Sequence, residues 1–89
     1  MFDLDQQWQV HPRVAVRPER FGALLYHFNT RKLSFLKNPT LLKILQSLGE
    51  QPSARAALVA ADVPAAQFDT YRKALDTLAT SNMIVQTGK

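Results

Sequence analysis

The chain has 89 residues, which suffices for one small hydrophobic core but not for two domains. Its hydrophobic content of 46% and charged content of 20% are typical of a folded globule and exclude a disordered segment. The absence of cysteine excludes a disulfide framework and a thiolate metal site. No apolar run is long enough to span a membrane, and the first residues lack the basic start of a signal peptide, so we expect a soluble cytoplasmic protein.

The net charge of +4 is unevenly distributed. Between residues 11 and 48 the single acid Glu19 faces seven bases, which are Arg13, Arg17, Arg20, Arg31, Lys32, Lys37 and Lys43. The rest of the chain is close to neutral. One interpretation is a solvated surface that keeps a small protein in solution, and the other is an anionic partner against the N-terminal half.

Residues 1–9 are predicted to form an arm in front of a single domain at residues 10–85. The arm is polar, with Phe2, Leu4 and Trp8 placed between its polar residues. Trp8 is expected to fold back on the domain, because an exposed indole is costly. The remainder of the arm is predicted to be mobile.

Residues 10–17 alternate in polarity, which predicts a strand with one face in water. Val14 and Val16 point to one side and the residues between them to the other. Pro12 has no N–H to donate, so the strand starts after it or lies on an edge. Residues 18–20 then lead into the next strand.

Residues 22–36 predict a β-hairpin, on which the rest of the prediction depends. Its arms are rich in Leu, Tyr and Phe, and residues 29–32 supply the turn. Pairing Phe28 with Leu33 also pairs Tyr26 with Phe35, and a slip by one residue would scatter the large side chains. We predict that the core face consists of Leu24, Tyr26, Phe28, Leu33 and Phe35. The opposite face, predicted to be partly in water, consists of Ala23, Leu25, His27, Ser34 and Leu36.

The periodicity becomes helical after the hairpin. Asn38 as N-cap, Pro39 at the first helical position and Gly49 as C-cap predict one helix, with a buried face of Leu41, Ile44, Leu45 and Leu48. An alanine-rich helix is expected at residues 53–61. A third helix follows Pro64, with its inward face predicted to be Phe68, Tyr71, Leu75 and Leu78. Residues 83–85 are expected to be a short extended piece.

The predicted order is therefore three strands followed by three helices, an α+β fold. The strands form a three-stranded antiparallel meander with the strand at residues 22–28 in the middle. A short middle helix and a turn before the last helix are typical of a winged helix-turn-helix, with the sheet as its wing.

Few residues of the chain suit catalysis, so we predict no enzymatic activity. The only imidazoles are His11 and His27, and no Ser/His/Asp arrangement follows from the spacing. A mid-strand histidine such as His27 is more often packed or hydrogen-bonded than a general base. Asp3 and Asp5 offer too few oxygen ligands for a hard cation, and the three glycines are too separated for a phosphate loop. We expect no catalytic residue, no metal and no cofactor.

Three binding roles remain open from the residues alone. A nucleic-acid-binding winged helix needs a basic recognition helix, whereas Arg72 and Lys73 are balanced by Asp69 and Asp76. A peptide-binding module needs a free edge strand beside an apolar helix face, and the hairpin and third helix offer both. The same edge could instead pair with a second copy of the chain.

The residues of the hairpin resemble the mycofactocin precursor-peptide chaperone family. The resemblance rests on Phe-Gly-Ala-Leu-Leu-Tyr-His-Phe at residues 21–28, Thr-Arg at 30–31, Leu-Ser-Phe-Leu at 33–36 and Pro-Thr-Leu at 39–41. Residues 14–18 and 52–57 are also similar to that family, and the match spans roughly residues 8–85. The family belongs to the peptide-recognition-element group, like the pyrroloquinoline quinone biosynthesis chaperone. Members of the group have three strands followed by three helices.

This resemblance implies a non-catalytic chaperone that binds the leader of a ribosomally made precursor peptide. It also implies presentation of that peptide to a radical S-adenosylmethionine maturase, which supplies the iron–sulfur chemistry. In the group the leader adds to the third strand and lies against the third helix, which correspond here to residues 32–36 and 67–79. The alternative interpretation is a winged-helix DNA-binding regulator. We expect a monomeric or weakly associating protein without nucleic-acid or membrane partners.

Ten residues are predicted to contact the peptide: Arg31, Lys32, Leu33, Ser34, Phe35, Leu36, Phe68, Tyr71, Arg72 and Leu75. On the helix, Tyr71 is expected to line a pocket with its hydroxyl in water, and Arg72 to bind an acidic side chain. Phe68 and Leu75 are better candidates for plain core than for pocket lining. The excess of bases predicts an acidic leader, and the outer faces of the first two helices are candidates for meeting the maturase.

Overall fold

The computed structural model describes residues 2–87 and shows an α+β fold. A three-stranded antiparallel sheet has the order β2 (Val14–Glu19), β3 (Gly22–His27) and β4 (Leu33–Leu36). Three helices follow, which are α1 (Pro39–Leu48), α2 (Ala54–Ala60) and α3 (Phe68–Thr80), the last preceded by a 3₁₀ turn at Ala65–Gln67. A second antiparallel sheet pairs β1 (Trp8–Val10) with β5 (Ile84–Gln86).

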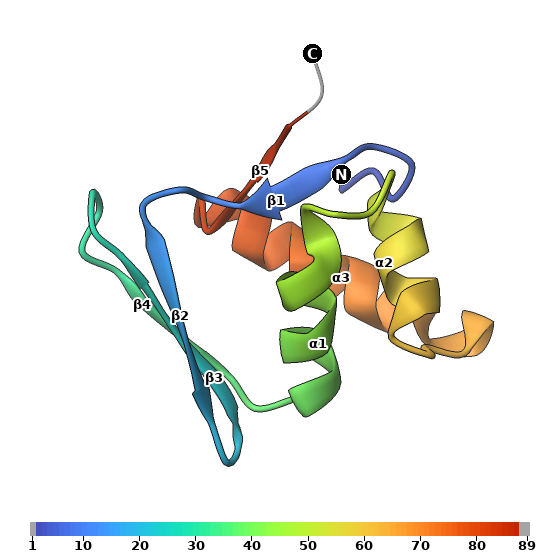
Figure 1. Ribbon diagram of the computed structural model, residues 1–89, viewed down its shortest axis with the longest axis horizontal. Helices are drawn as coiled ribbons and strands as arrows, with labels where there is room; N and C mark the ends of the chain where they lie inside the picture. Colours follow the sequence, from blue (N-terminus) through green and yellow to red (C-terminus); the bar gives the residue numbers. More distant parts are fainter. Residues whose placement is uncertain (1, 88–89) are drawn as a thin grey trace.

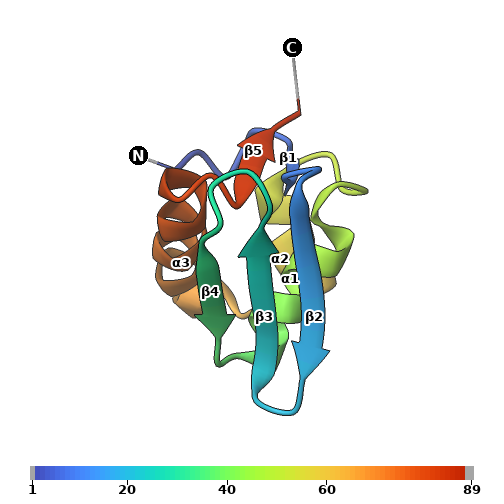
Figure 2. The same ribbon diagram turned by 90° about the vertical axis from the view of Figure 1, so that its left-hand side faces the viewer.

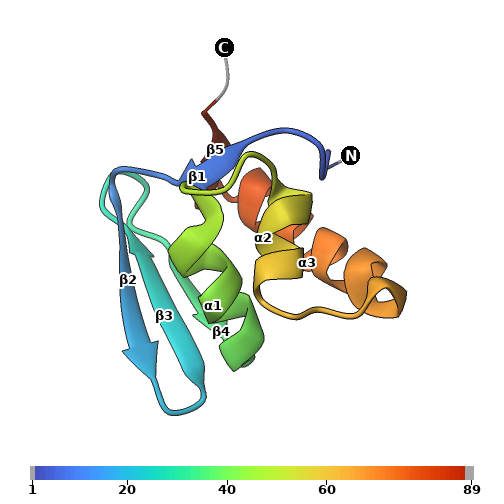
Figure 3. The ribbon, with the colours of Figure 1, turned by 45° about the vertical axis from the view of Figure 1, so that its right-hand side comes forward.

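The helices all lie on one side of the three-stranded sheet. Seen face on, β2, β3 and β4 stand in front and the helices behind them, with β4 on the side of α3 (Figure 2). The helix next to the sheet is α1, which packs against β3 and β4, and α2 and α3 lie beyond it (Figures 1 and 3). The β1–β5 ladder crosses one end of the molecule (Figure 1). One face of the sheet is thus buried by helices and the other is left open.

The predicted hairpin register and core face are both wrong. Tyr26 pairs with Leu33 and Leu24 with Phe35, a shift of two residues from the predicted pairing. The cause lies in the turn, where Arg31 adopts a left-handed φ of 60° and donates its N–H to the His27 carbonyl at 2.7 Å. An even shift keeps the same side chains together on each face.

The buried face is the one that we predicted to be partly in water. Leu25 and His27 have no exposed surface, whereas Phe28, Leu33 and Phe35 are 55%, 58% and 63% exposed. The small side chains of Ala23 and Ser34 lie on the buried face, and they leave room there for α1 to pack.

The predicted helices are confirmed together with their caps. Asn38 Oδ1 accepts hydrogen bonds from the N–H groups of Thr40 and Leu41 at 2.9 and 3.3 Å, and Pro39 follows it at the first helical position. The predicted inward residues of α1 are all buried: Leu41, Ile44, Leu45 and Leu48. In α3, Tyr71, Leu75 and Leu78 are buried as predicted, while Phe68 is half-buried.

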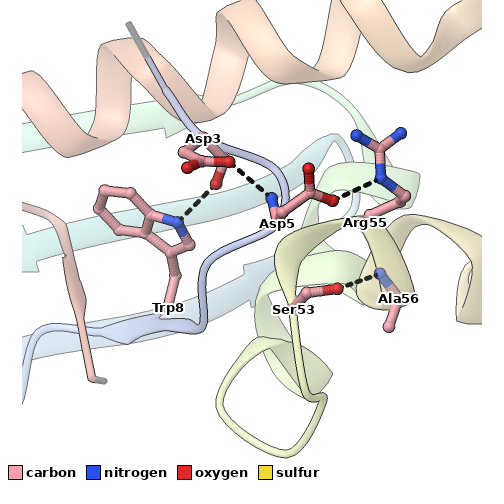
Figure 4. A network of polar contacts seen from close by, with 6 residues as sticks. All are labelled: Asp3, Asp5, Trp8, Ser53, Arg55 and Ala56. Carbon is pink, nitrogen blue, oxygen red and sulfur yellow. Dashed lines mark hydrogen bonds and ion pairs between the residues drawn. The ribbon is translucent and has the colours of Figure 1, made fainter. Parts of the chain in front are cut away.

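The N-terminal segment packs against the start of α2. The carbonyls of Gln6 and Leu4 accept hydrogen bonds from the N–H groups of Ala54 and Arg55 at 3.0 and 2.8 Å. These are donors that a helix N-terminus leaves without an intrahelical partner. The Asp5 carboxylate also pairs with the Arg55 guanidinium at 2.9 Å (Figure 4), and this hydrogen bond raises the pKa of Arg55. Residues 4–6 therefore help to cap α2.

Trp8 folds back on the domain, as predicted. Its indole N–H donates to the Asp3 carbonyl at 3.0 Å (Figure 4), and its ring stacks on the buried Phe2 with centroids 4.4 Å apart. β1 begins at Trp8, so the ladder with β5 crosses the boundary between residues 9 and 10 at which we expected the domain to start.

Alanine substitutions on the two faces of β3 and its turn test which face is the core. Leu25→Ala should lower the free energy of unfolding by about 2–5 kcal/mol, because it leaves a cavity at a fully buried position. Phe28→Ala should cost less than about 1 kcal/mol, since that ring is more than half exposed. Urea denaturation of both variants measures the difference, and equal losses would contradict the assignment of the faces.

Candidate functional site

A groove of about 370 Å³ lies between β4 and α3 and is the best candidate for a binding site. Its lining residues come from the end of β4, from α1 and from α3: Ser34, Phe35, Leu36, Lys37, Leu41, Ala74, Thr77 and Leu78. Most of these side chains are apolar, and Lys37 adds a positive charge. The groove therefore suits an extended chain with apolar and acidic side chains.

The wall of this groove on the sheet side is an unpaired strand edge. β3 is the only strand among residues 2–87 that pairs with β4. His27 donates to the Lys32 carbonyl at 3.0 Å, and antiparallel pairs alternate between bonded and non-bonded positions. The alternation turns the N–H and C=O groups of Leu33 and Phe35 toward the open side. These groups are a template for one more strand.

The opposite edge of the same sheet, along β2, is much less suitable for pairing. By the same alternation, the outward N–H positions of β2 belong to Val14, Val16 and residue 18. Val14 already donates to the His11 carbonyl at 2.9 Å, and Pro18 has no N–H. Only Val16 is left as an outward donor, so the sheet has one open edge, and the groove lies beside it.

The junction between β4 and α1 fixes the spacing of the groove walls. Asn38, which caps α1 through its Oδ1, donates through its Nδ2 to the Tyr71 hydroxyl on α3 at 3.0 Å. Gly22, with a φ of 145°, lies so close that a Cβ there would be 1.9 Å from the Leu36 carbonyl oxygen and 2.9 Å from the Asn38 nitrogen. Close approach at Gly22 lets β4 turn into α1 at this point.

The other end of β4 is organised by His27. Its Nδ1 accepts hydrogen bonds from the N–H groups of Asn29 and Thr30 at 3.2 and 3.4 Å. Because Nδ1 accepts, the ring proton is assigned to Nε2, which is buried without a hydrogen-bond partner. The His27 ring lies beside the His11 ring, with their centroids 4.5 Å apart. His27 is therefore a turn-ordering residue, in agreement with the prediction of a packed, hydrogen-bonded histidine.

The predicted site residues on the hairpin fall into three groups. Ser34, Phe35 and Leu36 line the groove. Leu33 contributes its outward backbone groups, while its side chain is exposed on the open face of the sheet. The turn residues Arg31 and Lys32 are exposed beside the start of β4, and the Lys32 N–H donates to Thr30 Oγ1 at 3.4 Å.

The predicted site residues on α3 are placed away from the groove lining. Leu75 is fully buried, Phe68 packs against the core, and the Tyr71 hydroxyl accepts a hydrogen bond from Asn38. Arg72 lines a separate hollow of about 360 Å³ beside the N-terminal segment. It pairs there with Asp69 at 2.6 Å, and its hydrogen bond is the main reason that the pKa of this carboxyl is lowered.

Five lining residues were not anticipated: Lys37, Leu41, Ala74, Thr77 and Leu78. A signal for part of this set was present in the sequence. Ala74, Thr77 and Leu78 have the spacing of neighbours on one helix face, and two of them are small. Small residues on one face of a helix leave room for a ligand side chain beside them.

The surroundings of the groove are positively charged. Arg31, Lys32 and Lys37 are exposed along β4 and its turn. Glu19, the one acid of residues 11–48, pairs with Arg17 on the far strand at 3.1 Å. In the described part of the chain, no three potential metal-ligating side chains gather, and no helix is long and apolar enough to cross a membrane.

Comparison with known proteins identifies the family to which this fold and groove belong. Residues 7–85 match the peptide chaperone MftB family. The chain is 57% identical over 84 residues to peptide chaperone MftB of Mycobacterium tuberculosis, covering 94% of this chain and 77% of that protein. The same identity holds for MftB of Mycolicibacterium smegmatis, with 82% of it covered, and 55% for MftB of Mycobacterium ulcerans, with 77% covered. No solved structure matches.

The chain is therefore of the peptide-chaperone class. It belongs to the peptide chaperone MftB family, which confirms the resemblance to the mycofactocin precursor-peptide chaperones. Chaperoning of peptides is a non-catalytic role, and the prediction that the chain is not an enzyme agrees with its family.

A pair of Gly→Ala variants tests the junction at which β4 turns into α1. Gly22→Ala should lower the thermal midpoint by several degrees and displace the end of β4, because its Cβ would collide with backbone. Gly49→Ala is the matched control: its φ is −72°, and its Cβ would meet only the Gln9 side chain at 3.4 Å. Thermal melts followed by circular dichroism compare the two. If both melted like the parent, the close approach at Gly22 would be wrong.

Proposed function

We propose that this chain binds the leader of a ribosomally synthesised precursor peptide and presents it to a radical S-adenosylmethionine maturase in mycofactocin-type biosynthesis. The leader adds to β4 as a fourth antiparallel or parallel strand. Membership of a peptide chaperone family supports the class of ligand. The observation that carries the mode of binding is the open edge of β4, which forms one wall of the groove.

Binding in this mode has two separate sources of free energy. The N–H and C=O groups of Leu33 and Phe35 supply ladder bonds that do not depend on the leader's sequence. Alternate leader side chains then enter the groove between Leu36 on one wall and Ala74 and Leu78 on the other. The ladder holds the peptide, and the groove selects it.

The charge distribution favours an acidic leader. Arg31, Lys32 and Lys37 flank the strand edge, and no acid of the described chain pairs with them. Charged groups on such a rim chiefly raise the association rate and suppress wrong partners.

The winged-helix description remains part of this proposal, with the β2–β3–β4 sheet as the wing beside α2 and α3. A role in DNA binding gains no support from α3. Its two cations, Arg72 and Lys73, both pair with Asp69, at 2.6 and 3.4 Å. A recognition helix would need such cations free for phosphate contacts.

Two Thr→Trp variants on α3 test whether the groove binds the leader. Thr77→Trp should fill the groove and weaken leader binding by about tenfold or more. Thr70→Trp is the control, because Thr70 is also exposed on α3 but does not line the groove. Calorimetric titration with a synthetic leader measures both. Parent-like affinity of Thr77→Trp would place the peptide elsewhere.

The salt dependence of leader binding tests the electrostatic part of the proposal. Raising the salt concentration from about 0.05 to about 0.5 M should weaken binding at least about threefold, since exposed charges are screened. Lys32→Gln combined with Lys37→Gln should flatten this dependence. Lys43→Gln, an exposed lysine of α1 outside the groove, should leave it unchanged. Salt-independent binding by the parent would remove electrostatics from the account.

A further inference from the structure

The face of the three-stranded sheet turned away from the helices is toward the viewer in Figure 2, and its exposed side chains form an apolar patch. The patch consists of Phe21, Leu24, Tyr26, Phe28, Leu33 and Phe35, of which all but Leu24 and Tyr26 count among the exposed large hydrophobic residues of the described chain. Its rings are already packed on one another: Phe21 lies 6.0 Å from Phe35, and Tyr26 lies 5.2 Å from Phe28 between centroids. Contiguous exposed apolar surface of this kind marks an interaction site.

Cations surround the patch. By strand register Arg17, which pairs with Glu19 at 3.1 Å, shares the row of Leu24 and Phe35, and Arg13 lies opposite Phe28, whose N–H donates to the Arg13 carbonyl. Arg31 and Lys37 are exposed on the β4 side. An occupant must therefore combine an apolar centre with an acidic rim. A second copy of this chain does not satisfy that condition, because two such faces would oppose cations to cations.

The patch adjoins the peptide groove and shares Phe35 with it. A strand added to β4 extends the sheet in its own plane, so the open face stays uncovered when a peptide is bound. The outward side chains of that peptide would then continue the rows of Leu33 and Phe35. A protein seated on the patch would touch the chaperone and its peptide together.

We propose that this open sheet face is the docking surface for the enzyme that modifies the bound peptide, through an apolar patch with an acidic rim on that enzyme. The inference rests on the proposed function. It places the enzyme on the sheet and not on the outer faces of α1 and α2. Among the described residues of those two helices, Val59 is the one exposed large apolar side chain.

The test separates enzyme binding from peptide binding. Tyr26→Thr combined with Phe28→Thr removes a packed ring pair of the patch at the end of the sheet away from the groove, and neither residue lines the groove or belongs to the open edge of β4. The matched control is Val59→Thr, an equally exposed apolar residue on α2. Biolayer interferometry measures the affinity of each variant for the maturase of the same biosynthesis, and calorimetry measures the affinity for the leader.

The double variant should bind the leader like the parent and the maturase at least about tenfold more weakly, while Val59→Thr should match the parent in both assays. Leader binding retained with unchanged maturase binding would overturn the docking surface alone. Failure of the parent to bind leader at all would overturn the proposed function instead. Two further outcomes would also overturn the proposal. If the parent sedimented as a dimer and the double variant did not, the face would bind a second copy of the chain. If the parent floated with phosphatidylglycerol vesicles and the double variant did not, the face would bind a lipid surface.

Discussion

Asn38 is the residue on which the geometry of the binding edge depends. Its side chain caps α1 through Oδ1 and donates to the Tyr71 hydroxyl on α3 through Nδ2, so one amide joins two helices. An asparagine can do this because its side chain carries both an acceptor and a donor. The end of β4 arrives at the same point, where the glycine at position 22 lets the backbone pass. The hydrogen bonds of Asn38 thus fix the position of α3 relative to the end of β4, and with it the width of the groove.

The two faces and the two edges of the three-stranded sheet differ in what they contact. The inner face is buried by α1, and its polar His27 uses Nδ1 to order the turn before β4. The edge along β2 is nearly without free donors, whereas the edge along β4 presents two residues to an incoming strand. One face and one edge are left open, and they adjoin. Under the proposed function, the edge would hold the peptide and the adjoining face would be left for the enzyme.

Local signals sufficed for much of the fold. The cap at Asn38, the alanine-rich composition of residues 53–61 and the helical spacing of leucines located the helices, because these features act within a few residues. The core face of the hairpin could not be predicted in the same way, since both faces are rich in apolar residues and only the position of α1 decides between them. The register depended on the left-handed conformation of Arg31. The β1–β5 ladder joins the two ends of the chain, and strands of three residues carry no periodicity of their own. The groove residues on α3 depended on the rotation of that helix, which follows from its packing.

Amide hydrogen exchange of the chain with and without saturating leader peptide tests strand addition most directly. The N–H groups of Leu33 and Phe35 face the open side of β4, while those of Ser34 and Leu36 already face β3. Nuclear magnetic resonance resolves these four amides individually. Added protection at Leu33 and Phe35, with little change at their two neighbours, is the result that the account predicts. Unchanged exchange at Leu33 and Phe35 under saturating leader would contradict it.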